Sequence, residues 1–216
     1  MLRQVYQALF PSRCLLCDGG GCSAGVDLCG ICERDLPGAM PAYRDADPPL
    51  AASFSPWRYD YPVDRLVLAL KFHGDRSVAR TLGRLLARRR VELAAPLPDR
   101  VVPVPLHPRR LRERGYNQAD EIARHVAAEL GLRRLPRALE RVRDTPAQSR
   151  LRAAGRRRNL ADAFRAASAA GPALAGRHIA LIDDVITTGS TARAAAAALL
   201  AGGAARVELW TLARAE

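Results

Sequence analysis

The chain has 216 residues and is 49% hydrophobic, which is enough for one medium-sized domain and a small additional segment. No apolar run approaches the roughly 20 residues that cross a membrane, and the N-terminal segment MLRQVYQALFPSRC lacks the apolar core of a signal peptide. We therefore expect a cytoplasmic protein without a membrane span. The net charge of +12 favours an anionic partner, although an Arg-rich genome is the alternative explanation, since 33 of the 34 basic residues are Arg.

All five cysteines lie within residues 14–32. Two Cys-x2-Cys pairs separated by 11 residues can enclose one Zn²⁺ in a tetrahedral thiolate site, and the glycine run at 19–21 permits a tight return between them. Disulfides are disfavoured in a cytosolic setting, and no βαβ pattern surrounds either pair as a redox motif would require. We expect structural zinc, with Cys22 either free or replacing one of four ligands: Cys14, Cys17, Cys29 and Cys32.

A proline-rich stretch separates this cysteine-rich segment from the rest of the chain. Residues 41–62 carry five prolines and predict a linker, with one strand around 54–59. Apolar residues then recur at helical spacing over 63–70 and 78–86. We place the boundary between the N-terminal segment with its linker and the main domain at residue 50, which gives two parts, 1–50 and 51–216.

The main domain alternates between strand and helix. RVVPVPLH (100–107) predicts a short buried strand that leaves into a loop, and Asn117 can cap a helix that Gly131 closes. A strand is expected within 135–142. A strand, a helix and a strand follow, at 178–182, 191–201 and 206–213. This alternation predicts an open, mostly parallel α/β sheet flanked by helices.

Positive charge is concentrated in residues 101–158, which hold 15 Arg against 6 acidic residues. Within this region LHPRRLRERGYNQA (106–119) is interpreted as a loop whose arginines can converge on an anion. Gly115 permits a sharp turn, and the N–H groups of the helix starting at Asn117 can contribute. A solvated basic loop that only caps the helix is the alternative. The arginines are Arg109, Arg110, Arg112 and Arg114.

The most informative stretch is IALIDDVITTGST (179–191), a short apolar strand followed by two aspartates and a Thr/Gly/Ser loop. Ser190 or Thr191 can N-cap the Ala-rich helix that follows. Backbone N–H groups and the helix dipole favour a phosphate monoester at such a loop, whose residues are Val185, Thr187, Thr188, Gly189, Ser190 and Thr191. Asp183 and Asp184 can accept hydrogen bonds from sugar hydroxyls or hold hydrated Mg²⁺. The stretch therefore suits a ribose 5-phosphate, the alternative being an ordinary strand–turn–helix with two exposed aspartates.

These residues resemble the phosphoribosyl-diphosphate (PRPP) motif of type I phosphoribosyltransferases. Three further segments resemble the ComF family of competence-associated proteins: LKFHGD around Lys71, the single lysine of the chain; RERGYNQ at 112–118; and the stretch 144–164. The resemblance covers the chain from the cysteine cluster to the C-terminus. Many ComF-like proteins carry a second cysteine cluster, which is absent or degenerate here because no cysteine follows Cys32.

The resemblance implies a type I phosphoribosyltransferase-like open, mostly parallel sheet behind an N-terminal zinc ribbon with four cysteine ligands. It further implies displacement of diphosphate from C1 of Mg²⁺-bound PRPP by an unknown acceptor, with a role in DNA uptake. The catalytic candidates are Asp183, Asp184, Lys71, Arg109 and Arg110. The candidates for the diphosphate and for a closing loop are Arg112, Arg114, Gly115, Tyr116, Asn117, Arg156 and Arg157.

The alternative function is a non-catalytic competence protein that binds single-stranded DNA and DNA-uptake proteins, with PRPP as a regulatory or vestigial ligand. Single-strand binders commonly interleave aromatic and basic residues. The basic region 101–158 contains Tyr116 as its one aromatic residue, which argues against a base-stacking platform there and leaves backbone binding open.

Overall fold

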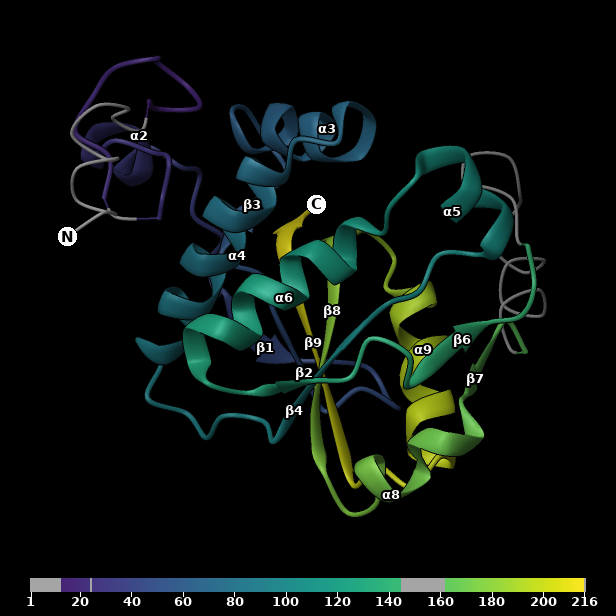
Figure 1. Cartoon of the computed structure of the whole chain (residues 1–216). Helices are drawn as coiled ribbons and strands as arrows, with labels where there is room; N and C mark the ends of the chain where they lie inside the picture. The colour runs from purple at the N-terminus through teal and green to yellow at the C-terminus, as the bar shows by residue number, and fades with distance from the viewer. Residues whose placement is uncertain (1–12, 24, 145–161, 216) are drawn as a thin grey trace, which may run out of the picture.

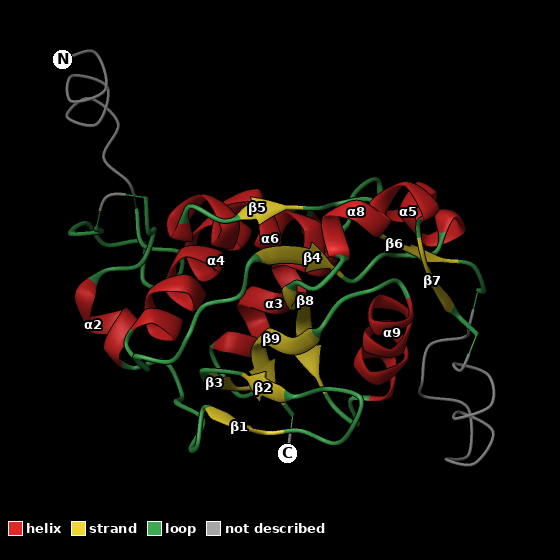
Figure 2. Cartoon of the chain, turned by 90° about the horizontal axis from the view of Figure 1, so that it is seen from below, coloured by secondary structure: helices red, strands yellow, loops and turns green. Residues whose placement is uncertain are grey.

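The computed structural model describes residues 13–23, 25–144 and 162–215. Its main element is a seven-stranded sheet in the order β1-β2-β9-β8-β4-β5, with β3 also pairing β9, and Figure 2 shows this order. The pairings are parallel except that of β1 with β2. The strands are β1 (Tyr43–Asp45), β2 (Ala52–Phe54), β3 (Trp57–Arg58), β4 (Arg100–Pro103), β5 (Arg133–Arg134), β8 (His178–Ile186) and β9 (Arg206–Arg214). The predicted open, mostly parallel sheet is confirmed.

Helices cover both faces of this sheet, as Figure 1 shows. Along β8, Ala180 and Ile182 pack into one core cluster, whereas Ile179 and Leu181 pack into the other. This is the alternation expected of a strand with two buried faces, and it explains why the segment is apolar throughout. The first face carries α3 (Val63–His73), α4 (Arg76–Val91) and α6 (Gln118–Leu130), and the second carries α9 (Ser190–Ala201).

The start of α6 is fixed by Asn117. Its side-chain oxygen accepts a hydrogen bond from the backbone N–H of Ala119 at 3.1 Å, as an N-cap should. Its side-chain amide donates to the carbonyl of Val104 at 3.0 Å. Gly131 ends the helix with φ of 66°, so the predicted helix and both of its signals are confirmed. One side chain thereby fastens α6 to the end of β4.

The basic segment after β4 is not the predicted loop. It forms α5 (Pro108–Arg114), which begins where the His107 ring accepts a hydrogen bond from the N–H of Arg109 at 3.3 Å. Proline at the first position favours this start, and Gly115, with φ of 81°, ends the helix. An i,i+4 ion pair between Arg109 and Glu113 adds to it. The predicted loop is therefore wrong, whereas the convergence of its arginines on an anion stays a prediction.

The expected strand within 135–142 covers only three residues and does not belong to the main sheet. It is β6 (Leu139–Arg141), which pairs with β7 (Phe164–Ala166) in a separate two-stranded sheet. The edge strand of the main sheet next to β4 is β5 instead. Two short helical elements, η2 (Ser168–Ala170) and α8 (Gly171–Leu174), follow β7.

Two details of the acidic segment also differ from expectation. β8 continues past residue 182 to Ile186, because its parallel pairing with β9 extends to the register Ile186–Arg214. Asp183 and Asp184 therefore lie within the strand and not after it. The N-cap of α9 is Gly189, with φ of 69°, and Ser190 is the first helical residue. Glycine takes this left-handed conformation at little cost, so the hydroxyl N-cap predicted at Ser190 or Thr191 is wrong.

The cysteine-rich segment packs on the first helical layer. Val26, Leu28 and Leu36 belong to the same core cluster as α3 and α4, and the backbone N–H of Asp27 donates to the Thr81 hydroxyl at 2.9 Å. This segment contains α2 (Gly30–Arg34), seen beside α4 in Figure 1. Among the described residues, no helix has the length and apolar character to cross a membrane.

Candidate ligand-binding site

The site lies at the carboxyl ends of two neighbouring parallel strands, after which the chain continues on opposite faces of the sheet. After β4 the chain enters α6 on one face of the sheet and continues to β5, whereas after β8 it enters α9 on the other face and continues to β9. β4 and β8 are neighbours. Their carboxyl ends therefore form a topological switch point, which is where open α/β sheets bind ligands.

Asp184 is the buried anchor of this site. It is 5% exposed. Its Oδ2 lies 3.2 Å from the Lys71 ammonium nitrogen and accepts a hydrogen bond from the Gln118 amide at 3.1 Å, while its Oδ1 accepts from the N–H of Val185 at 2.7 Å. α3, α6 and β8 are thus joined at one carboxylate. The ammonium and the amide offset the cost of burying its charge.

Asp183 is in a different electrostatic position. Burial raises the pKa of Asp183 to about 7, the negative charge of Asp184 adds to this increase, and the N–H of Asp184, Lys71 and Arg141 oppose it. The N–H of Asp184 donates to Asp183 Oδ1 at 2.9 Å. An acidic pair in which one carboxyl is held near neutral pH is typical of a functional site, because its charge responds to a bound cation or hydroxyl group.

The turn from β8 to α9 carries the predicted phosphate-binding residues. Thr187 and Thr188 are exposed, Gly189 is buried, and Ser190 and Thr191 are half-buried. The hydroxyl oxygens of Thr188 and Ser190 lie 3.0 Å apart. A Cβ on Gly189 would lie 3.1 Å from the Arg193 guanidinium and 3.4 Å from Ile186. The turn therefore exposes hydroxyls and backbone at the N-terminus of a 12-residue helix, a location that favours anions.

The arginines of α5 lie in three different surroundings. Arg109 and Arg110 face Asp144, at 3.6 and 3.8 Å, and line a shallow hollow together with Glu113 and Asp144. Arg112 is exposed. Arg114 instead donates to the side-chain oxygen of Gln118 at 2.7 Å.

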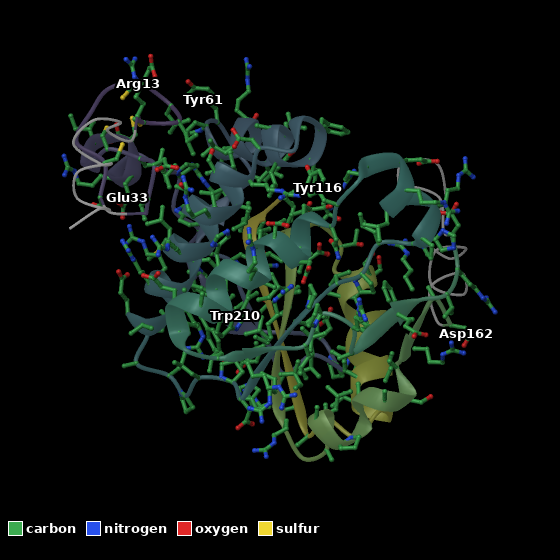
Figure 3. The ribbon with its side chains drawn as sticks, viewed as in Figure 1. Arg13, Glu33, Tyr61, Tyr116, Asp162 and Trp210 are labelled. Carbon is green, nitrogen blue, oxygen red and sulfur yellow. The ribbon has the colours of Figure 1, made fainter. Side chains whose placement is uncertain are left out.

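The residues around Gly115 link α5 to α3. The Arg114 guanidinium carbon lies 5.8 Å from the centre of the Phe72 ring. Tyr116 packs against the first core cluster near Gly74, and Figure 3 shows it between the end of α3 and the start of α6. Lys71, which is 113 positions from Asp184 in the sequence, reaches the carboxylate from this corner.

Sequence reasoning missed three residues that the fold brings to this region. Gln118 and Asp144 lie within two segments of the family resemblance, RERGYNQ and 144–164, but have no role among the sequence-based candidates. Arg141 carries no sequence signal. Burial and the nearby charge of Arg110 lower the pKa of Arg141, which also interacts electrostatically with Asp183 and Asp144. Arg156 and Arg157 lie outside the described residues.

The four predicted zinc ligands form one cluster. The Sγ atoms of Cys14, Cys17, Cys29 and Cys32 all lie within 4.8 Å of one another, and those of Cys17 and Cys29 are 3.8 Å apart. A tetrahedral Zn²⁺ with sulfur ligands at about 2.3 Å needs sulfur–sulfur distances of about 3.8 Å. The five described cysteines are all unbridged, and Cys22 is outside the cluster. Four cysteines are thus positioned to bind a metal such as zinc.

Comparisons with known proteins find relatives over most of the sequence. The chain is 36% identical over 227 residues to the DNA utilization protein YhgH of Salmonella typhi, covering 94% of this chain and 97% of that protein. It is 34% identical over 232 residues to the YhgH protein of Escherichia coli K12, with the same coverage. It is 38% identical over 163 residues to Competence protein F of Haemophilus influenzae, covering 73% of this chain and 70% of that protein. No family model matches the chain.

Solved structures show a weaker likeness. A glutamine PRPP amidotransferase from B. subtilis, complexed with ADP and GMP, aligns with a TM-score of 0.39 and 22% identity over 60% of this chain and 25% of that one. An allosteric regulatory enzyme of purine biosynthesis aligns with a TM-score of 0.41 and 19% identity over 62% of this chain and 26% of that one. The aligned part is therefore about a quarter of these longer proteins.

The sheet order, the polar switch point and the N-terminal four-cysteine cluster define an open, mostly parallel α/β protein with a cysteine cluster near its N-terminus. Within that class, the identities to YhgH and Competence protein F over most of the sequence identify the family. The chain belongs to the ComF family.

Proposed function

We propose that the carboxyl edge of the sheet binds Mg²⁺-bound PRPP and that the protein transfers its phosphoribosyl group to an acceptor with release of diphosphate. The observation that carries this proposal is the position of the Asp183–Asp184 pair. It lies in β8 at the switch point between β4 and β8, and Val185 and Ile186 separate it from the turn into α9. Acidic groups beside a helix N-terminus suit a ligand that has both a diol and a phosphate.

The turn 187–191 is the proposed cradle for the 5-phosphate. Backbone N–H groups at the start of α9 and the positive end of its dipole attract a phosphate. The hydroxyls of Thr187 and Thr188 are exposed at this turn. The turn offers hydrogen-bond donors, and the Arg193 guanidinium lies beside Gly189, which together suit a phosphate monoester.

The acidic pair is the proposed partner of the ribose hydroxyls and of Mg²⁺. Carboxylate oxygens are the ligands that Mg²⁺ prefers, commonly with several waters retained, so the donor set fits. Bound Mg²⁺ would supply neutralisation of the diphosphate charge. The chain's own contribution is to hold the sugar at C1 in line with the acceptor and to keep Lys71, 23% exposed at its side chain, beside that position.

Lys71, Arg109 and Arg110 are the proposed cations for the departing diphosphate. Arg109 and Arg110 now face the Asp144 carboxylate. Because these distances are 3.6 and 3.8 Å and Arg109 is 67% exposed at its side chain, the pairings are weak. A diphosphate with higher charge can replace Asp144 as their partner, which supports the placement of the leaving group at α5.

The test is calorimetric titration of Mg²⁺-PRPP into the full chain and into the variant Asp183→Asn/Asp184→Asn. The proposal requires binding by the native protein and a large loss in the variant, with the melting curve retained. Release of diphosphate in the presence of candidate nucleophiles then tests transfer. Equal PRPP affinity of native protein and a folded variant would remove the aspartates from the site.

A second candidate is a protein that binds single-stranded DNA, with PRPP as a regulatory ligand. The name of the YhgH relatives, DNA utilization protein, supports a connection with DNA. In this case the basic surface would neutralise a nucleic-acid backbone and DNA affinity would fall steeply with salt. Titrating PRPP with and without single-stranded DNA separates the two candidates, because only a regulatory ligand changes DNA affinity without being consumed.

A further inference from the structure

A continuous chain of polar contacts leads from the surface of α5 into the site. The Arg114 guanidinium donates to the Gln118 side-chain oxygen at 2.7 Å, and the Gln118 amide nitrogen donates to Asp184 Oδ2 at 3.1 Å. The same Oδ2 lies 3.2 Å from the Lys71 nitrogen. Four side chains from α3, α5, α6 and β8 are therefore linked in series.

The orientation of Gln118 in this chain is determined by its neighbours. Gln118 is 6% exposed, so its amide cannot rotate freely into water. A guanidinium has only donors, and an ionised carboxylate has only acceptors. Arg114 therefore selects the oxygen of the Gln118 amide and Asp184 selects its nitrogen. Reversing the amide would place two donors face to face at one end and two acceptors at the other.

The two adjacent aspartates differ in how many of their carboxylate acceptor positions are taken by donors of the protein. Both oxygens of Asp184 have partners within the chain, Lys71 and Gln118 at Oδ2 and the Val185 N–H at Oδ1. These donors take three of the roughly four lone-pair positions of the carboxylate, and Asp184 is buried, so a ligand hydroxyl or metal has little room to reach it. Asp183 is more exposed than Asp184, and it accepts a local hydrogen bond from the N–H of Asp184.

We propose that Gln118, held by Arg114, is a positioning residue that locks Asp184 against Lys71, so that Asp183 is the aspartate that contacts the ligand and Asp184 fixes the Lys71 ammonium. The ligand contacts in this inference rest on the proposed function. The positioning of Lys71 does not, because it can be measured without any ligand.

The single lysine gives a direct measurement of that positioning. Lysine labelled with ¹³C at Cε and incorporated into the full chain gives one resonance, since Lys71 is the only lysine. We expect Gln118→Met, which keeps side-chain length and removes both hydrogen bonds, to move this resonance. Asp184→Asn should move it as well. Arg124→Met is the matched control, because it removes an exposed ion pair with Glu121 on the same helix, and it should leave the resonance in place.

A double-mutant cycle separates positioning from a general structural effect. If Gln118 acts through Asp184, Gln118→Met should cause little further movement of the Lys71 resonance in the Asp184→Asn background. Should Gln118→Met fail to fold, Arg114→Met tests the same series from its surface end. It should move the resonance in the native background and leave it unchanged in Asp184→Asn. Additive movements, or an unmoved resonance in Gln118→Met, overturn the positioning role.

PRPP binding then tests the division between the two aspartates. We expect Asp183→Asn to weaken Mg²⁺-PRPP binding more than Asp184→Asn, and Gln118→Met to weaken it by about tenfold, the effect of one lost hydrogen bond to a charged group. Equal losses in Asp183→Asn and Asp184→Asn, with an unmoved lysine resonance in the latter, would show that Asp184 contacts the ligand itself. If the native protein does not bind PRPP at all, the proposed function fails while the lysine measurement still decides the positioning role.

Discussion

Arg90 of α4 and Glu208 of β9 form a buried ion pair, with 3.6 Å between Arg90 Nη2 and Glu208 Oε2. Their side chains are 0% and 2% exposed, and the pair lies away from the ligand-binding edge of the sheet. The Arg90 guanidinium lies over the rings of Tyr43 and Trp210, at 5.3 and 5.1 Å from their centres. It also donates to the carbonyls of Ala95 and Pro96. This buried pair joins α4, the connection to β4 and the strand β9, which carries Trp210, labelled in Figure 3. Both terminal nitrogens of Arg90 have partners, whereas its Nε has no hydrogen-bond partner among the described residues.

The stability of the protein should depend on pH through Glu208. Burial by itself raises the pKa of Glu208, but hydrogen bonds from His178, Tyr43 and Trp210 outweigh it and lower the pKa from 4.5 to about 2. A carboxylate whose pKa is depressed by folding stabilises the native state above its unfolded pKa and loses this effect as pH falls toward the folded pKa. We expect Glu208→Gln to reduce the free energy of unfolding at pH 6 by roughly 2–5 kcal/mol.

Denaturant unfolding between pH 6 and pH 2.5 measures this effect. The difference between native protein and Glu208→Gln should narrow as pH falls through the interval from 4.5 to about 2. Glu92→Gln, at a carboxylate that is 59% exposed and pairs with Arg89, is the matched control and should follow the native curve. A difference that stays constant with pH would contradict the ionised state of Glu208 as its cause.

Gly83 should be irreplaceable at the crossing of α4 and α6. A Cβ there would lie 3.0 Å from the His125 Cβ and 3.0 Å from the carbonyl oxygen of Ile122. Because backbone must move to relieve this contact, we expect Gly83→Ala to destabilise the protein by about 1–3 kcal/mol. Gly171→Ala, where nothing lies within 4 Å of the added Cβ, should cost nothing. Thermal melting of both variants checks this, and equal melting temperatures would contradict the close approach.

One Zn²⁺ per chain should bind to the four-cysteine cluster. Elemental analysis of protein purified without added metal should find it, and Cys17→Ser should lose it whereas Cys22→Ser, outside the cluster, should retain it. Because this short segment has little hydrophobic core of its own, removing the metal should unfold mainly residues 14–36. Hydrogen exchange then rises there while the sheet stays protected. A reduced, metal-free and equally protected segment would argue against a metal site.

The cations of α5 should distinguish diphosphate from nucleic acid. We expect Arg109→Ala/Arg110→Ala to reduce PRPP affinity with a modest salt response, because a small preorganised site releases few counterions. If the pair instead follows a nucleic-acid backbone, single-stranded DNA affinity should fall by about 0.7 log units per log unit of salt for each phosphate neutralised. Arg133→Ala, exposed on β5 at the opposite end of β4, is the control. Loss of DNA binding alone in the double variant would favour the DNA-uptake function.

Local chemistry in the sequence determined the elements whose signals are short-range. The apolar run before Asp183, the Asn117 cap and the paired Cys-x2-Cys spacing each depend on residues a few positions apart. The predicted α/β sheet, the helix ending at Gly131 and the cysteine cluster therefore agree with the structure. Pro108 and Gly115 are local signals for the helix α5 as well. The segment was nevertheless predicted as an anion-binding loop because of its many arginines.

Tertiary structure alone decided which side chains meet. The contact of Lys71 with Asp184, the burial of Arg90 beside Glu208 and the pairing of β6 with β7 join segments that are distant in sequence. The extension of β8 to Ile186 depends on the length of β9 beside it. Such contacts follow from how the helices pack on the sheet, and that packing depends on burying apolar surface from the whole chain at once. The sequence by itself therefore determined the residue types of the site, and packing decided their partners.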